Sequence, residues 1–133
     1  MGWGIDDRPK KRRTQGMAVV DYTLAKRALL RGVKDGFLSR LEICDAHPEL
    51  LRAAKYHGEP ASRECPVCDA EELRLLTYVY GDGLKADNGR VWPLQKGLGL
   101  AATHPGATCY VVEVCMSCNW NHLSEAFRAQ HAG

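Results

Sequence analysis

Two cysteine pairs constrain the fold of this chain more than any other feature. Cys65 and Cys68 enclose two residues, and so do Cys115 and Cys118. This spacing lets a tight turn aim two sulfurs at one metal ion, and two such turns complete a tetrahedral set. The pattern predicts a zinc ribbon in which all four cysteines bind Zn2+. Four protein ligands leave no open position for water or substrate, so the pattern favours a binding protein over an enzyme.

Length and composition limit the class of protein. A chain of 133 residues suits one compact domain, or a helical unit joined to a small metal-stabilised unit. Hydrophobic residues make up 45% and charged residues 26%, which excludes a wholly disordered chain. No apolar run approaches the roughly 20 residues that cross a bilayer, and the first residues lack the pattern of a signal peptide. We therefore expect a cytoplasmic protein without membrane contact.

Positive charge is concentrated near the N-terminus, at Arg8, Lys10, Lys11, Arg12 and Arg13. Residues 17–133 carry 13 basic and 14 acidic side chains, because five of the 18 basic and two of the 16 acidic residues precede them. Such a cluster can bind phosphate through Coulomb attraction and counterion release, or can simply be a solvated end. The first predicted helix carries Lys26, Arg27 and Arg31, which could extend this cluster into a surface that binds nucleic acid or a partner. A solvated helix face is the alternative.

The chain divides into three predicted segments: a flexible basic arm (1–16), a helical segment (17–58) and a zinc-ribbon-like β unit (59–133). Asp21 is the predicted N-cap of a first helix, and Gly36 ends it in the left-handed conformation. Ser39 and Glu42 form a capping box for a short second helix. A third helix is predicted to begin near Pro48 and to end at Gly58.

The β unit is predicted from apolar runs bounded by turn residues. Strands are expected at 73–80 and 108–115, with a short one at 90–92. Residues 95–107, which contain three glycines and a proline, are predicted to form a loop, and residues 123–130 a closing helix with Phe127 inward. The predicted fold class is α+β: N-terminal helices followed by a zinc-ribbon-like antiparallel β unit with a short C-terminal helix.

Other chemistry is also compatible with six cysteines. An iron–sulfur cluster also takes four cysteines, a secreted disulfide framework takes an even number, and a redox pair takes the same two-residue spacing. Two copies of the spacing, with two further cysteines, favour a metal in a reducing compartment. Asp69 and Asn119, which follow the two pairs, are the non-glycine residue types that best tolerate the left-handed turn of a metal-binding knuckle.

Four further residues are candidates for metal binding or thiol chemistry. Cys44 and His47 have the spacing of half a second metal site, but a small buried cysteine is the simpler interpretation. Cys109 lies on the strand before the second pair and is expected in the core, with ligand substitution or thiol sensing as alternatives. His122 is a candidate substitute ligand or a histidine that neighbours the site.

Several of these motifs occur together, and the combination resembles a known family. The motifs are Cys44 to Ala54, Cys65-Pro66-Val67-Cys68, Tyr78-Val79-Tyr80-Gly81-Asp82, Val112-Glu113-Val114-Cys115, and Cys118 to Leu123. Over about residues 19–128 they resemble a family of short actinobacterial proteins of unknown function. The resemblance implies a bacterial cytoplasmic zinc-ribbon protein and carries over no catalytic residues. The cysteine pairs are also similar to those of zinc ribbons in transcription and ribosomal proteins, an analogy of fold.

These observations predict a non-enzymatic zinc-binding accessory factor. Its expected partners are RNA or DNA, or components of RNA polymerase or the ribosome. The alternatives are a protein–protein interaction adaptor with purely structural zinc, and a thiol-based redox or metal sensor. No small-molecule substrate is expected, because the chain has no phosphate-binding glycine loop and no recognisable Ser/His/Asp context.

Overall fold

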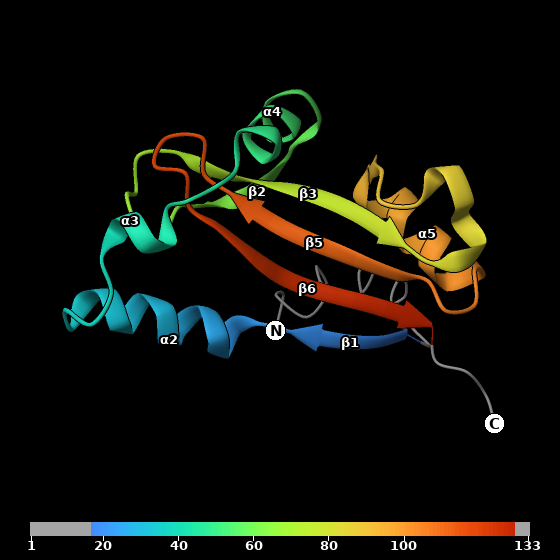
Figure 1. The fold of residues 1–133 in the computed structure, drawn as a ribbon, viewed down its shortest axis with the longest axis horizontal. Helices are drawn as coiled ribbons and strands as arrows, with labels where there is room; N and C mark the ends of the chain where they lie inside the picture. The colour runs from blue at the N-terminus through green and yellow to red at the C-terminus, as the bar shows by residue number, and fades with distance from the viewer. Residues whose placement is uncertain (1–16, 130–133) are drawn as a thin grey trace, which may run out of the picture.

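An antiparallel sheet forms the centre of the molecule (Figure 1). The computed structural model describes residues 17–129. Strand order is β1-β6-β5-β3-β2, and β4 pairs with β3 at the side of this path. The strands are β1 (Met17–Asp21), β2 (Glu59–Glu64), β3 (Glu72–Tyr80), β4 (Val91–Trp92), β5 (Thr108–Val114) and β6 (Asn121–Ala129). Every pairing is antiparallel.

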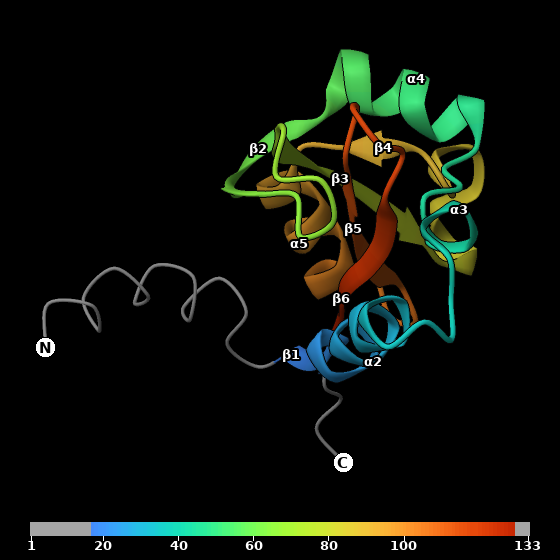
Figure 2. The same ribbon diagram turned by 90° about the vertical axis from the view of Figure 1, so that its left-hand side faces the viewer.

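The helices occupy both faces and one end of this sheet. They are α2 (Thr23–Lys34), α3 (Arg40–Ile43), α4 (Pro48–His57) and α5 (Leu94–Thr103), with the 3-10 helix η1 (Asp82–Asp87) between β3 and β4. Figure 2 shows α4 and α2 on opposite sides of the view, with the strands between them. No helix in the described part of the chain has the length and apolar character needed to span a membrane.

Strand alternation places different residues on the two faces of the sheet. Val79, Cys109 and Phe127 lie side by side on β3, β5 and β6, and they form one core cluster with Leu98 and Ala101 of α5. A second cluster joins two residues from the opposite face, Leu76 and Val114, to Ala54 of α4. Residues of opposite parity on a strand point to opposite faces, so α4 and α5 cover opposite faces.

A third cluster lies at the end of the sheet that carries the cysteine pairs. Its buried members are Ile43, Cys65, Leu73, Cys115 and Trp120. Leu29, Leu30 and Val33 of α2 pack against this cluster while only partly buried, and α2 has no buried residue of its own. The position of α2 therefore depends on contacts with the cysteine end of the sheet.

The predicted helix ends are largely confirmed. Ser39 and Glu42 form the reciprocal capping box, Gly36 has φ +84°, and α4 begins at Pro48 and is followed by Gly58. The predicted N-cap Asp21 is wrong by one residue: Tyr22 precedes the helix, and Asp21 ends β1, although its side chain accepts a hydrogen bond of 2.7 Å from the Thr23 N–H. Local signals of this kind identify helix ends because they satisfy backbone groups that the helix leaves without partners.

The α+β class and the strands β3, β4 and β5 are as predicted, but the order of helices and strands is not. Residues 17–21, predicted as part of the helical segment, form a strand paired with β6. Residues 94–103, nearly all of them inside the predicted loop of residues 95–107, form α5. Residues 121–129 form β6 instead of a closing helix, although Phe127 is buried as expected. Pairing with β5 and β1 on both sides outweighs the local preference of this segment.

Close packing of α5 gives a first test. A Cβ atom added at Gly97 would lie 2.5 Å from Cγ2 of Thr77, whereas one added at Gly99 meets nothing within 4 Å. We expect Gly97→Ala to lower the free energy of unfolding by about 1 to 3 kcal/mol through overpacking. Gly99→Ala on the same helix should leave it unchanged or raise it by up to about 1 kcal/mol. Urea unfolding of both variants measures the difference, and equal stabilities would contradict this packing of α5.

Candidate metal centre

Both cysteine pairs lie in turns at the same end of the sheet. Cys65 and Cys68 occupy the turn between β2 and β3, and Cys115 and Cys118 the turn between β5 and β6. All four Sγ atoms lie within 4.8 Å of one another. Within residues 17–129 this is the only such group of His, Cys, Asp or Glu. The fold thus brings together the four predicted ligands from two distant parts of the chain.

The two turns repeat the same backbone geometry. Asp69 N donates to the Cys65 carbonyl and Asn119 N to the Cys115 carbonyl, both at 3.1 Å. Asp69 has φ 55° and Asn119 has φ 71°, so both adopt the predicted left-handed conformation. Aspartate and asparagine enter this region more readily than other residues with a side chain. The turn geometry therefore follows from residues adjacent to the cysteines.

Backbone N–H groups in each turn point at the sulfurs. Val67 and Ala70 donate to Cys65 and Cys68 at 3.4 Å, and Ser117 donates to Cys115 at 3.3 Å. Hydrogen bonds to sulfur favour the thiolate over the thiol. The two cysteines of the first pair have opposite pKa shifts. The N–H of Ala70 helps to lower the pKa of Cys68 to about 7, whereas burial raises the pKa of Cys65.

The sulfur positions fit one tetrahedral ion. Sγ of Cys65 lies 3.7 Å from that of Cys118, and Sγ of Cys68 lies 3.6 Å from that of Cys115. A tetrahedral zinc with Zn–S bonds of about 2.3 Å requires sulfurs about 3.8 Å apart. Burial raises the pKa of Cys118, and the neighbouring thiols Cys44 and Cys65 add to this effect. A cation would compensate the charge that the thiolates otherwise concentrate in a small volume.

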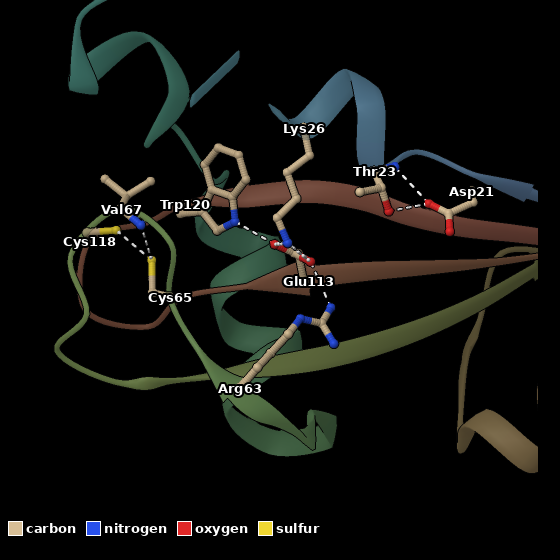
Figure 3. A network of polar contacts seen from close by, with 9 residues as sticks. All are labelled: Asp21, Thr23, Lys26, Arg63, Cys65, Val67, Glu113, Cys118 and Trp120. Atoms are coloured by element: carbon tan, nitrogen blue, oxygen red, sulfur yellow. Dashed lines mark hydrogen bonds and ion pairs between the residues drawn. The ribbon is translucent and has the colours of Figure 1, made fainter. Parts of the chain in front are cut away.

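A buried carboxylate lies next to the cysteine turns and was not recognised from the sequence (Figure 3). Glu113 of β5 is fully buried. Its oxygens accept hydrogen bonds from Lys26 at 3.1 Å, Arg63 at 2.8 Å and the indole N–H of Trp120 at 2.8 Å. Burial alone would raise the pKa of Glu113, but these hydrogen bonds outweigh burial and lower it.

The Glu113 contacts connect three elements to the centre of the sheet. Lys26 belongs to α2, Arg63 to β2, and Trp120 follows the second cysteine turn. Trp120 is fully buried and stacks on His122, with ring centroids 5.5 Å apart. A shallow pocket of about 250 Å³ borders this network, but its lining includes Asp21 and Glu125 as well as Lys26 and Arg63. The lining therefore carries charges of both signs.

The remaining candidate residues have separate positions. Cys109 is buried in the core as predicted, where burial raises its pKa to about 12. His47 accepts a hydrogen bond from Glu49 N and caps α4, so the suggested half-site with Cys44 is not formed. Cys44 instead lies with its Sγ 3.7 Å from that of Cys118. His122 is outside the four-sulfur group and stacks on Trp120.

The basic residues predicted to bind a partner differ in availability. Arg27 and Arg31 are exposed on α2. Lys26 is less available to a partner, because its ammonium group pairs with Glu113 at 3.0 Å and its side chain is only 22% exposed. Arg8, Lys10, Lys11, Arg12 and Arg13 lie outside the described residues.

Fold and site together define a small α+β protein with a closed four-cysteine group that can hold one metal ion. The chain belongs to DUF5318, a family of unknown function, which matches residues 12–132. The uncharacterised proteins Rv0049 of Mycobacterium tuberculosis and Mb0050 of Mycobacterium bovis are each 43% identical to it over 108 residues, which is 81% of this chain and 79% of the relative. No solved structure matches the chain. The resemblance to an actinobacterial family is thus confirmed.

Removing one sulfur tests the metal centre. We expect Cys115→Ala to bind no metal and to lose the packing at this end of the sheet. At such sites metal binding contributes on the order of 10 kcal/mol to the free energy of folding. Cys109→Ala is the matched control, since it removes a buried thiol from the core cluster and should keep one metal equivalent. Elemental analysis and circular dichroism measure both outcomes. A full metal equivalent with unchanged β-structure in Cys115→Ala would contradict the assignment.

Neutralising Glu113 tests the buried ion pairs. Glu113→Gln should lower the free energy of unfolding by about 1 to 3 kcal/mol near pH 7, because Lys26 and Arg63 lose their counter-charge. Arg27→Gln, on an exposed position of the same helix, should change it by less than about 0.5 kcal/mol. The pKa of Glu113 is lowered in the folded state, so its stabilisation is present above the ordinary glutamate pKa and is lost as pH falls through the folded value.

The gap between the wild type and Glu113→Gln should therefore stay constant from about pH 8 to 5 and narrow only below about pH 4. Urea unfolding at several pH values measures it. A gap that opens instead of narrowing on acidification would show that the carboxylate is not the stabilising form.

Proposed function

We propose that this protein is a non-enzymatic zinc-binding accessory factor that acts in the cytoplasm by binding nucleic acid or the transcription or translation machinery. The observation that carries the proposal is the closed four-sulfur group, against which α2 packs while its arginines stay exposed. With all four positions around a metal filled by protein, the ion has a structural role. Function then depends on the surfaces that the metal holds in place.

Zinc is the metal that the donor set supports best. Tetrahedral sites of four thiolates suit zinc or iron. Sulfurs that lie within 4.8 Å of one another match a single ion, and leave no space for the bridging sulfides of an iron–sulfur cluster. The N–H groups that point at Cys65, Cys68 and Cys115 suit the thiolate form that zinc requires.

The exposed side of α2 is the proposed contact surface. Arg27 and Arg31 are one helical turn apart and therefore lie on the same side of the helix. Lys34 in the last turn is exposed as well. Guanidinium groups form paired hydrogen bonds with phosphate, which makes this surface suitable for a nucleic-acid backbone. In the sequence, a basic cluster at residues 8–13 precedes β1.

A protein-interaction adaptor is the second candidate. Phe37, in the connection between α2 and α3, and Leu41, in α3, have 85% and 84% of their surface exposed. Exposed large apolar side chains can anchor a protein–protein contact. Such a partner would bind through these two residues instead of through phosphate contacts.

Replacing the two arginines separates these candidates. We expect the zinc-loaded full chain to bind a fluorescent single-stranded RNA or duplex DNA, with affinity that falls steeply as salt rises. Arg27→Gln/Arg31→Gln should weaken binding roughly tenfold or more and reduce the salt slope by about 2. Arg52→Gln on α4 is the control, because it removes an exposed arginine from another helix. Fluorescence anisotropy measures each affinity.

Absence of binding by the wild type at low salt would reject the nucleic-acid version. If a partner is instead recovered from native cells after nuclease treatment, and is lost with Phe37→Ser/Leu41→Ser but retained with the arginine variant, the adaptor is supported. The two pairs of substitutions thus give opposite results for the two candidates.

A further inference from the structure

A fifth thiol lies beside the four-sulfur group. Sγ of Cys44 is 3.7 Å from Sγ of Cys118, which is the same separation as between Cys118 and its fellow ligand Cys65. Cys44 does not belong to the group of four, whose sulfurs all lie within 4.8 Å of one another. Cys118 is therefore the sulfur shared between the metal set and this additional thiol.

Hydrogen bonds hold the segment of Cys44 against the second cysteine turn. Cys44 follows the last residue of α3 and its N–H donates to the Arg40 carbonyl at 2.8 Å. Ala46 N donates to the Asn119 carbonyl at 3.0 Å, and Asn121 donates to Asp45 at 3.1 Å. These two contacts join the residues just after Cys44 to the residues just after Cys118, and so keep the two sulfurs close.

Exposure distinguishes this sulfur pair from the others. Cys44 and Cys118 are both partly exposed, whereas Cys65 and Cys115 are fully buried. Cys68 is also partly exposed, but the sulfur within 3.6 Å of it is that of Cys115, a member of the metal set. Only Cys118, among the described sulfurs, combines access from solvent with a close thiol outside the set of four.

We propose that Cys44 is the resolving thiol of a peroxide-sensitive switch at Cys118, an inference that rests on the metal centre of the proposed function. As a metal ligand Cys118 would be deprotonated. Its sulfur attacks a peroxide, an S–O bond forms as the O–O bond breaks, and Cys118 becomes a sulfenic acid. The Cys44 sulfur then attacks Cys118, so that an S–S bond forms and the S–O bond breaks. In sum, two thiols are oxidised to one disulfide, their two electrons reduce one hydrogen peroxide, and two molecules of water form.

The disulfide removes Cys118 from the metal set and leaves three sulfurs for the ion. It also protects Cys118, because a sulfenic acid that finds no thiol is oxidised further to the irreversible sulfinic acid. A thiol reductant should then restore the site completely. Reversible metal release distinguishes a switch from oxidative damage.

The experiment exposes the zinc-loaded full chain to hydrogen peroxide and follows zinc release with a coloured chelator. Disulfides are mapped by mass spectrometry, and zinc is added back after reduction with a dithiol. Cys44→Ser is the test variant, and Cys109→Ser, a thiol remote from the metal set, is the matched control. In the wild type and in the control we expect a Cys44 to Cys118 disulfide and nearly full recovery of zinc binding.

Cys44→Ser should hold one zinc before oxidation and recover at least about twofold less zinc binding after it, with sulfinic acid at Cys118. Equal recovery in Cys44→Ser and the wild type, a disulfide that excludes Cys44, or no zinc release from the wild type would each overturn the proposal. Loss of zinc from unoxidised Cys44→Ser would also overturn it, because Cys44 would then be a ligand.

Failure of the proposed function gives a different result. If the wild type binds no metal, the zinc centre is rejected, while the disulfide map of the peroxide-treated chain still decides whether Cys44 pairs with Cys118. Absence of that disulfide in the metal-free chain overturns the switch as well.

Discussion

Four thiols confined within 4.8 Å are the constraint on which this structure depends. They lie in two turns that 46 residues of chain separate and that meet at one end of the sheet. Thiolates at such separations repel one another unless a cation compensates their charge. The end of the sheet in turn supports α2, which contributes only partly buried side chains to the cluster there. A metal at the cysteines would therefore stabilise a helix that contains none of its ligands.

Glu113 provides a second connection between the same elements. Its carboxylate is fully buried, yet it accepts hydrogen bonds from α2, from β2 and from Trp120. Removing any one of these donors would leave the buried carboxylate partly uncompensated, and this would lower the free energy of unfolding. Trp120 directly follows the left-handed Asn119 of the second cysteine turn, so the ionic network and the sulfur group share one segment of chain.

The parts of the molecule that could be predicted from sequence are those with local signals. Cysteine spacing identified the sulfur group, the Ser39 capping box identified α3, and apolar alternation identified β5. The elements that were missed depend on distant partners: β6 is a strand because it pairs with β1 and β5, and α5 packs through Gly97, one of three glycines that suggested a loop. Periodicity in one segment carries no information about such pairing.

The difference between local signals and distant contacts also explains which parts of the site could be predicted. A glutamate within an alternating strand gives no sign that a lysine from α2 and an arginine from β2 will meet it. The spacing of Cys44 and His47 suggested a shared metal, yet His47 caps α4 and Cys44 approaches Cys118. Because Cys118 is both a candidate ligand and the neighbour of Cys44, oxidation there would weaken the contacts that hold α2 and its arginines in place. In the proposed function, the redox state of one sulfur would thus control the surface that binds the partner.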